Sequence, residues 1–288
     1  MVNTQTMLYM LSETKYSMMS YVIITRRDRA IVIDGGWAED MPNLKRHINN
    51  REIAAWILTH PHKDHISGFV NEIMQNGGRD FDIKKIYYHF PPFEDLHNHT
   101  PEDYSYYKSE FEDMLPAFNS ILPQIEPLTH IVEQGESIII DEIKIDFLFT
   151  YHDYLTSNVM NDSSLVFKVN APNKSVLFLG DIGPQGGDVL YWESRDLLKA
   201  DIVQMAHHGH VCCGMEIYAA INPKICLWNT DEWLYNEKEV PEFLEDFELA
   251  RKRNRTRMYG TPITRKWMDS LGIKEHYYTK DGTQVLKI

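Results

Sequence analysis

The chain has little cysteine, with three residues among 288, and two of these, Cys212 and Cys213, are adjacent. An ordinary disulfide framework needs several spaced cysteines, so none is expected. Long apolar runs are also missing, since no run approaches the roughly 20 residues that span a bilayer. The first residues have neither a basic start nor a continuous apolar segment, as a secretory signal would have. These absences predict a cytoplasmic protein that does not insert into a membrane.

Basic residues are also in short supply, because 29 Lys and Arg face 42 Asp and Glu, for a net charge of −13. A surface this acidic argues against long nucleic acid as a partner. One local exception is the basic run from Arg251 to Arg257, either a solvated helix end or an anion-binding rim. Hydrophobic residues make up 43% of the chain, enough for the core of one large domain spanning residues 1–288.

Short apolar runs alternate with amphipathic ones, which predicts an α/β chain with two β layers flanked by helices. The run Ile53–Leu58 (IAAWIL) is typical of a buried strand, and His65–Gln75 carries an apolar stripe at helical spacing. The aromatic and acidic stretch at residues 91–128 predicts a helical insertion over the site or against a partner, or a peripheral helix pair. At the end of the chain, His276–Tyr278 and Gln284–Lys287 predict a hairpin that turns at Asp281-Gly282.

The stretch THPHKDHISG, residues 59–68, places three histidines and an aspartate within six positions. His60 and His62 are two residues apart, so they point the same way from an extended segment. Asp64 and His65 follow where the helix begins, and they point elsewhere. Neutral imidazole and carboxylate are ligands for Zn²⁺ and also for Mn²⁺ or Fe. One turn can therefore serve two metal ions.

Two further strands end in ligand-type residues. The apolar run Ser175–Leu179 ends in Gly-Asp at Asp181, and a carboxylate at the mouth of a buried strand needs a partner such as a pair of cations. The run Asp201–Met205 is followed by His207 and His208. Taken singly, an aspartate at a helix start is a cap, a Gly-Asp is a turn and a histidine pair is an exposed loop. Together, at strand ends, they indicate a binuclear site bridged by Asp181.

These motifs, together with Asp34-Gly35-Gly36, resemble those of the metallo-β-lactamase fold superfamily. The resemblance runs from about Ser20 to the end and implies a four-layer αββα sandwich. The segment Asn161–Val166 (NDSSLV) is similar to a narrower branch. That branch comprises the hydrolase domains of bacterial DNA-uptake channel proteins and the phosphorylcholine esterases.

The resemblance also implies ligand sets. The first ion is expected at His60, His62 and Asp181, and the second at Asp64, His65 and Asp181 with a histidine of the last cluster. We assign that histidine as His207 and leave His208 to face the substrate, although the sequence does not decide between them. The family's third-motif histidine is absent, and Asn161 and Asp162 stand in its place. These two residues are expected to bind substrate or to serve as weak ligands.

The expected function is a binuclear metal-dependent hydrolase that uses a metal-bound hydroxide. Asp64 would orient the hydroxide, and His208 would stabilise developing charge or protonate the leaving group. The expected partner is a small anionic or phosphodiester substrate, and the expected ions are two Zn²⁺, with Mn²⁺ or Fe as alternatives. Two other functions stay open: an ester, thioester or lactone hydrolase of the same fold, and a catalytically silent metal-binding module. A homodimer is an open alternative to a monomer.

Overall fold

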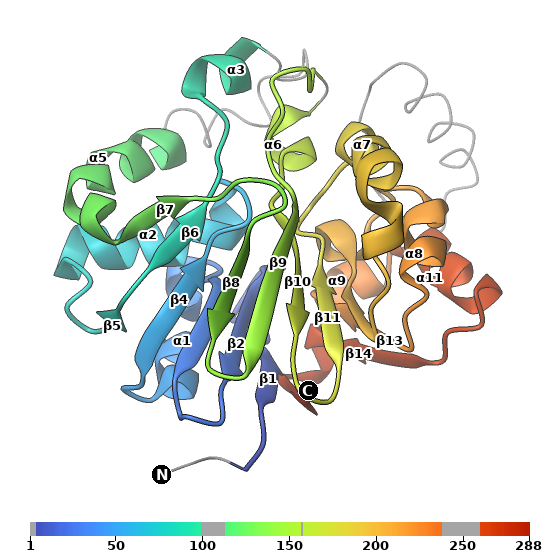
Figure 1. The fold of residues 1–288 in the computed structure, drawn as a ribbon, viewed down its shortest axis with the longest axis horizontal. Coiled ribbons are helices and arrows are strands. Elements are labelled where there is room, and N and C mark those ends of the chain that lie inside the picture. Colours follow the sequence, from blue (N-terminus) through green and yellow to red (C-terminus); the bar gives the residue numbers. More distant parts are fainter. Residues whose placement is uncertain (1–3, 99–112, 157, 238–259) are drawn as a thin grey trace.

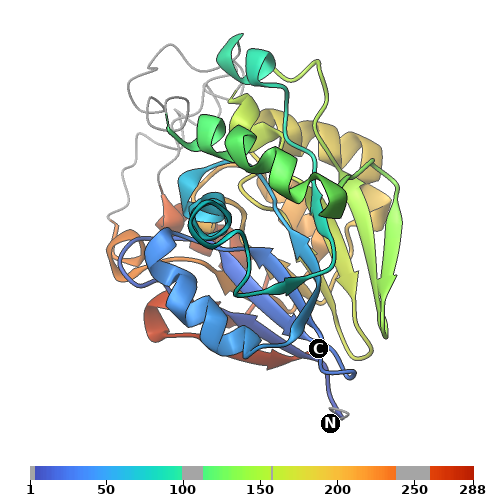
Figure 2. The same cartoon turned by 90° about the vertical axis from the view of Figure 1, so that its left-hand side faces the viewer.

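Two β-sheets lie face to face, and helices cover the outer face of each sheet (Figure 1, Figure 2). The computed structural model describes residues 4–98, 113–156, 158–237 and 260–288. The order of layers is helix, sheet, sheet, helix, which confirms the predicted αββα sandwich. The basic run at residues 251–257 lies outside the described residues.

The first sheet is antiparallel at one side and parallel at the other. Its strands, in spatial order, are β15 (Gln284–Lys287), β1 (Met7–Met10), β2 (Ser20–Ile24), β3 (Ala30–Asp34), β4 (Glu52–Ile57), β6 (Ile86–Tyr88) and β7 (Thr129–Ile131), with β5 (Asp82–Ile83) also paired to β4. The pairs from β15 to β3 are antiparallel, and those from β3 to β7 are parallel.

The second sheet has the same mixed character. Its strands, in spatial order, are β14 (Glu275–Tyr278), β13 (Ile225–Trp228), β12 (Ile202–Gln204), β11 (Ser175–Phe178), β10 (Val166–Asn170), β9 (Ile143–Phe149) and β8 (Ser137–Ile140). The pairs from β8 to β11 are antiparallel, so β8 with β9 and β10 with β11 form two hairpins. The pairs from β11 to β14 are parallel.

The helices form two outer layers. They are α1 (Met41–Ile48), α2 (Lys63–Asn76), α3 (Phe93–Asn98), α5 (Leu115–Ile125), α6 (Val159–Asp162), α7 (Pro184–Ser194), α8 (Met215–Ile221), α9 (Glu232–Tyr235) and α11 (Thr261–Ser270). No helix among the described residues is long and apolar enough to cross a membrane.

Three apolar clusters fill the three interfaces between the four layers. The cluster between the sheets includes Tyr21 and Ile33 from one sheet with Phe147 and Phe178 from the other. A second cluster joins the first sheet to α1, α2 and α5, and a third joins the second sheet to α7, α8 and α11. Because each sheet is covered on both faces, the central strands β2, β3, β12 and β13 are buried at every position.

The C-terminal hairpin expected from Asp281-Gly282 is wrong. Strand β14 pairs in parallel with β13 in the second sheet, whereas β15 pairs antiparallel with β1 in the first sheet. A short 3-10 segment, Thr279–Asp281, carries the chain between the two sheets. Without β15 the backbone groups of β1 would form an open sheet edge, so the last strand is used to cover that edge.

The segment expected as an insertion contributes to two different places. Helix α5 packs against α2 through Phe118 and Ile121, so it belongs to the outer helix layer of the first sheet. Helix α3 lies apart from it, near the end of β9, and its Asp95 accepts a hydrogen bond from Tyr151 at 2.7 Å (Figure 1). Residues 99–112 between them lie outside the described residues, so an insertion at residues 91–128 stays a prediction.

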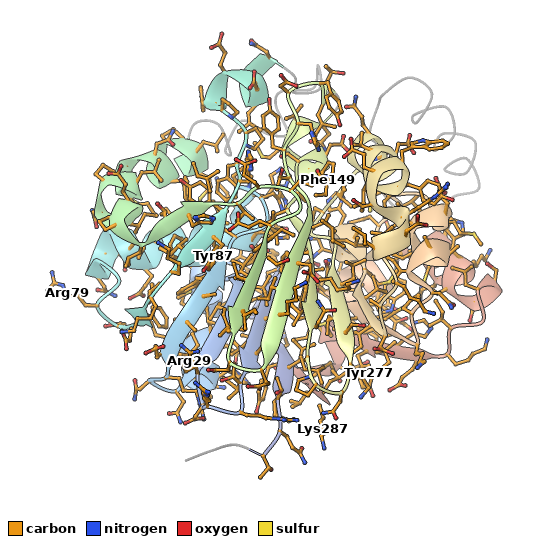
Figure 3. The ribbon with its side chains drawn as sticks, viewed as in Figure 1. Arg29, Arg79, Tyr87, Phe149, Tyr277 and Lys287 are labelled. Atoms are coloured by element: carbon orange, nitrogen blue, oxygen red, sulfur yellow. The ribbon has the colours of Figure 1, made fainter. Side chains whose placement is uncertain are left out.

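An ion pair ties the two sheets together at one end of the sandwich. Arg29 precedes β3 and donates to both carboxylate oxygens of Asp141, at 3.0 Å and 2.6 Å, in the β8–β9 turn. Thr25 adds a hydrogen bond to the same carboxylate at 2.7 Å. Figure 3 labels Arg29 at this end and Phe149, the last residue of β9, near the other. The histidine-rich loops gather at the Phe149 end.

Candidate metal centre

The histidines and aspartates singled out in the sequence lie where strands of both sheets end. Asp34 closes β3, the histidine-rich turn follows β4, Asp181 follows β11, and His207 and His208 follow β12. All these strands point the same way, so their carboxyl ends meet at one edge, where α/β sheets place their ligands. Residues far apart in the chain are thereby brought within a few ångströms of one another.

The first group of ligands consists of His60, His62 and Asp181. One ligand atom from each lies within 4.8 Å of the others, and all three residues are buried. His60 Nε2 is 3.0 Å from His62 Nδ1 and 3.8 Å from Asp181 Oδ2. His62 still has extended backbone, at φ −77° and ψ 151°, and α2 begins at the next residue. This confirms that His60 and His62 leave an extended segment on the same side.

The second group consists of Asp64, His65 and His208, again with one ligand atom from each within 4.8 Å of the others. Asp64 and His65 stand in the first turn of α2, and His208 comes from the other sheet. His208 Nε2 lies 2.9 Å from Asp64 Oδ2. One turn of chain thus supplies residues to two separate groups, as the spacing of the motif predicts.

Asp181 lies between the two groups. Its Oδ1 is 3.3 Å from His65 Nε2 in the second group, and its Oδ2 is 3.8 Å from His60 Nε2 in the first. His208 Nε2 is 3.6 Å from Oδ2 as well. A carboxylate that lies within 4 Å of histidines from both groups is placed to bridge two cations.

The protonation states of the first group suit ligands. Burial lowers the pKa of His60 well below its usual range and that of His62 to about 4, so both rings are neutral near pH 7. Burial alone would raise the pKa of Asp181, but the imidazoles of His65 and His207 bring it well below the usual range. Neutral imidazoles and ionised carboxylates are the forms that bind metal ions.

Buried polar atoms without a hydrogen-bond partner fit the same interpretation. Both oxygens of Asp181 and Nε2 of His65 are buried and accept or donate no hydrogen bond within the described structure. A buried ionised carboxylate without hydrogen bonds strongly destabilises the folded protein unless cations compensate its charge. The donor set of imidazole nitrogens and carboxylate oxygens matches the preferences of Zn²⁺ and similar ions. The residues present therefore fit two divalent ions.

Asp34 holds the ring of His65 in place. His65 Nδ1 lies 2.7 Å from Asp34 Oδ2, and Thr59 donates to the same carboxylate from its backbone N at 2.8 Å and its hydroxyl at 2.7 Å. With Nδ1 directed at Asp34, the lone pair of Nε2 is directed toward Asp181. Sequence reasoning quoted Asp34 as part of a motif but gave it no role.

The loop after β12 orients His208. Two consecutive residues, His207 at φ 49° and His208 at φ 56°, have left-handed backbone, which is uncommon outside glycine. Two contacts hold this conformation: Thr230 donates to the carbonyl of His208 at 2.6 Å, and His208 Nδ1 lies 3.0 Å from the carbonyl of Asn229. The Nδ1 contact leaves Nε2 of His208 available as a ligand atom.

The geometry favours His208 over His207, which the sequence analysis preferred, as a member of the second group. His208 joins Asp64 and His65, whereas His207 stands outside both groups, with its Nε2 3.6 Å from Asp181 Oδ2 and a side chain that is 17% exposed. Neighbouring histidines look alike in a sequence, but the left-handed backbone buries the ring of His208 and leaves that of His207 partly exposed. His208 is therefore the better candidate ligand, and His207 is the more exposed of the two rings.

A buried glutamine fixes the turn that carries Asp181. Gln204 Oε1 accepts from the backbone N of Leu179 and of Gly180, at 2.8 Å and 2.9 Å, and its Nε2 donates to the carbonyls of Gly180 and Met205. Gly180 has φ +56°, and a Cβ there would lie 2.9 Å from Ser164 Cβ. Gln204 was given no role in the sequence analysis. A polar side chain inside the apolar run at residues 201–205 does, however, indicate that it has buried hydrogen-bond partners.

Asn161 and Asp162 differ in their surroundings. Asp162 Oδ1 accepts from the backbone N of Gly186 at 2.8 Å, so this carboxylate caps the first turn of α7. Burial raises the pKa of Asp162 to about 7. Asn161 is also buried, but neither its Oδ1 nor its Nδ2 has a hydrogen-bond partner in the described chain. Whether either residue binds substrate stays a prediction.

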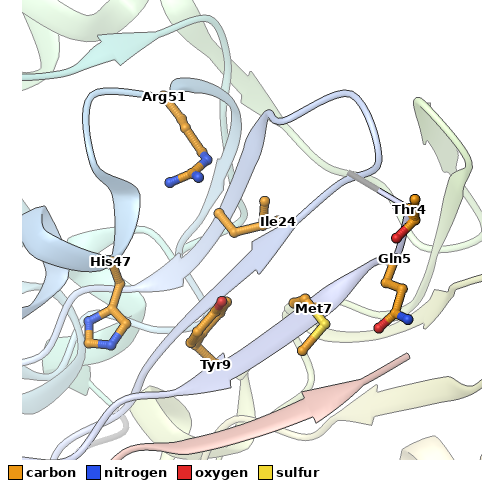
Figure 4. Close-up of a pocket in the computed structure, with 7 residues that line it drawn as sticks. All are labelled: Thr4, Gln5, Met7, Tyr9, Ile24, His47 and Arg51. Carbon is orange, nitrogen blue, oxygen red and sulfur yellow. The ribbon is translucent and has the colours of Figure 1, made fainter. Parts of the chain in front are cut away.

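A cavity of about 260 Å³ lies at the end of the first sheet that is opposite to the histidine cluster (Figure 4). Its lining residues are Thr4, Gln5, Met7, Tyr9, Ile24, His47 and Arg51. The two basic side chains contact protein groups, since His47 Nδ1 is 2.9 Å from the carbonyl of Asn43 and Arg51 donates to Asp28 at 2.7 Å. The histidine cluster therefore remains the candidate functional site.

A model of the metallo-beta-lactamase superfamily matches residues 18–211. This segment contains every residue of the two ligand groups. A search of the curated proteins gave no significant match.

Solved structures share the fold at low identity. The metallo-beta-lactamase fold protein YhfI from Bacillus subtilis is 14% identical, with a TM-score of 0.55 over 98% of this chain and 100% of that one. CmlA, a diiron beta-hydroxylase from Streptomyces venezuelae, is 13% identical, with a TM-score of 0.55 over 99% of this chain. This chain spans 54% of the length of CmlA. Likeness at these identities shows a common fold.

Proposed function

The chain belongs to the metallo-β-lactamase superfamily, and from this membership we propose that it is a binuclear hydrolase of phosphodiester bonds. Membership and the two His/Asp groups make it a metal-dependent hydrolase; the phosphodiester substrate is our proposal. The observation that carries it is the position of Asp181, whose carboxylate lies within 4 Å of histidines from both groups. Such an arrangement is that of a two-metal site.

The charge of the site favours an anionic substrate. Two divalent ions would bring four positive charges, and the carboxylates of Asp64 and Asp181 return two. The pocket would keep a positive charge in a chain whose net charge is −13. Because bound cations are the largest local charges, an anionic group is attracted to this place rather than to the surface at large.

The residues around the site have separate roles in this proposal. When bound, such ions polarise a phosphoryl oxygen and lower the pKa of water to about 7. Asp64 is 23% exposed at its side chain, so its carboxylate can accept a hydrogen bond from an attacking water. His207 is partly exposed and would donate a hydrogen bond to the leaving oxygen. His208 serves as a ligand.

A resemblance to one branch of the family is our reason for proposing a phosphodiester. The segment from Asn161 to Val166 is similar to that of DNA-uptake channel hydrolase domains and of phosphorylcholine esterases, which share phosphodiester substrates. The acidic surface disfavours a duplex, so we propose a small substrate or a short oligonucleotide. The three cysteines are buried and free, which agrees with a reducing compartment, so we place the protein in the cytoplasm.

Metal analysis combined with hydrolysis assays tests the proposal. The protein, purified without chelators, is assayed for Zn, Mn and Fe, and for turnover of bis-p-nitrophenyl phosphate and of p-nitrophenyl acetate. Two ions per chain and turnover of the phosphodiester support it. Turnover of the carboxylic ester alone would favour an ester or lactone hydrolase. One ion without turnover would favour a silent metal-binding module.

A further inference from the structure

Asn161 has a property that, among the described side chains, it shares only with Asp181. Each has two polar atoms that are buried and lack a hydrogen-bond partner. Asn161 is 1% exposed. A buried polar group left unpaired costs about 1–3 kcal/mol, so a native structure rarely keeps one without a reason. For Asp181 the reason is the pair of cations, and the same reason suits Asn161.

The backbone places Asn161 beside the first ligand group. Ser164 donates from its backbone N to the carbonyl of Asn161 at 2.9 Å, and its hydroxyl accepts from the backbone N of Asp181 at 3.1 Å. The next residue, Leu165, donates to the carbonyl of Thr59 at 2.9 Å, just before His60. The segment therefore contacts both strand ends that carry this group.

Asp162, the neighbouring residue, has a different task. Its Oδ1 bonds the first turn of α7 at Gly186, and a Cβ added at Gly183 would lie 2.5 Å from the same oxygen. This carboxylate is enclosed by the start of α7 and faces that helix. Of the two residues that replace the family's third-motif histidine, only Asn161 keeps both polar atoms without a partner in the described chain.

The number of donors leaves a place for one more ligand. The second group has three residues, and Asp181 adds a fourth donor to it. The first group has only His60, His62 and the shared Asp181. Ions such as Zn²⁺ take four ligands, so the first position needs another donor from the chain or from solvent.

We propose, building on the binuclear site proposed above, that Asn161 Oδ1 is the fourth protein ligand of the ion held by His60, His62 and Asp181. A neutral amide oxygen is a weaker donor for Zn²⁺ than an imidazole nitrogen, and it suits harder ions such as Mn²⁺. The two positions are therefore unequal: the ion at the first group is the more weakly bound and the more readily exchanged.

Calorimetric titration of the metal-free protein with Zn²⁺ tests this assignment. The wild type is expected to bind two ions with different affinities. Asn161→Ala should keep the tighter site and weaken the other by roughly 10-fold or more. Asn161→His should tighten the weaker site, since imidazole replaces the amide. The matched control is Asn158→Ala, which removes another buried asparagine of the same segment and should leave both affinities unchanged.

A melting-temperature cycle separates a ligand from a structural residue. If Asn161 is a ligand, Zn²⁺ raises the melting temperature of Asn161→Ala less than that of the wild type. A variant that is destabilised without metal but gains the same increase from Zn²⁺, or that binds both ions as tightly as the wild type, would overturn the assignment. Two unequal ions without phosphodiester turnover would refute the proposed function and leave Asn161 as a ligand.

Discussion

Oδ1 of Asp181 lies 3.3 Å from Nε2 of His65, although the two residues follow strands of different sheets. The site therefore exists only when the two sheets are packed against each other. The apolar cluster between the sheets sets the distance between these strand ends, and bound ions would in turn hold the ends together. Folding and metal binding are expected to be coupled in this protein.

Replacing Asp181 should remove the bridge. In Asp181→Asn the carboxylate that faces both groups is lost, so we expect at most one ion per chain and a fall in phosphodiester turnover of roughly 100-fold or more. Metal content by mass spectrometry and hydrolysis of bis-p-nitrophenyl phosphate measure the two effects. Asp201→Asn is the control, because Asp201 stands at the opposite end of β12, where it accepts from Ser175 at 3.0 Å. Two ions in Asp181→Asn would contradict the bridging role.

The two neighbouring histidines should behave differently. His208→Ala removes a member of the second group, so one ion should be lost or bound much more weakly. His207→Ala should keep both ions while kcat for the phosphodiester falls by about 10²-fold or more, as when a hydrogen-bond donor to developing charge is removed. Metal content and kcat of the two variants show which histidine is the metal ligand. The opposite pattern would restore His207 as ligand and His208 as the substrate-facing residue.

The ion pair between Arg29 and Asp141, at the end of the sandwich opposite to the candidate site, should affect stability and not catalysis. Hydrogen bonds from Arg29 overcome the effect of burial and lower the pKa of Asp141. A carboxylate with a lowered folded pKa stabilises the protein above its unfolded pKa of about 3.9, and this stability is lost as pH falls through the folded pKa. Because Arg29 is partly exposed, Arg29→Met should cost about 1–2 kcal/mol at pH 7.

Urea denaturation from pH 7 down to pH 3 measures this effect. The difference between wild type and Arg29→Met should be constant down to about pH 5 and shrink below about pH 4. Lys84→Met, which breaks the exposed pair with Asp82, is the control and should change stability by less than about 0.5 kcal/mol. An equal difference at pH 3 and pH 7 would show that packing of the arginine, and not its ion pair, matters.

Much of the fold could be predicted because the signals are local. The apolar stripe at His65–Gln75 lies within α2, and the apolar runs ending in Asp, Gly-Asp or His become strands that end at the site. The failure at the last two strands has a different origin. A turn signal at Asp281-Gly282 describes the local chain, whereas the strand partner is decided by the open edge of β1, far away in the sequence.

The site was predictable as a set of ligand types and less so as a geometry. Residue spacing separated His60 and His62 from Asp64 and His65, and the structure has the same division. The choice between two adjacent histidines depends on positive φ angles that their residue types do not signal. The carbonyl of Asn229 that orients His208 is a backbone group, so the residue type at position 229 does not indicate this contact.

Gln204 should control metal affinity without touching a metal. Its side-chain amide makes four hydrogen bonds with the backbone of the turn before Asp181 and with Met205. Gln204→Glu keeps the acceptor for Leu179 and Gly180 but cannot donate, so the turn loosens and Zn²⁺ affinity should fall roughly 10-fold or more. The control, Ser194→Ala, removes a buried hydrogen bond to the carbonyl of Leu148 in the outer layer. It should cost about 1 kcal/mol of stability and leave Zn²⁺ affinity unchanged. If Gln204→Glu loses stability yet binds Zn²⁺ like the wild type, the glutamine supports the strand alone and the position of Asp181 is fixed by the packing of Gly180 against Ser164.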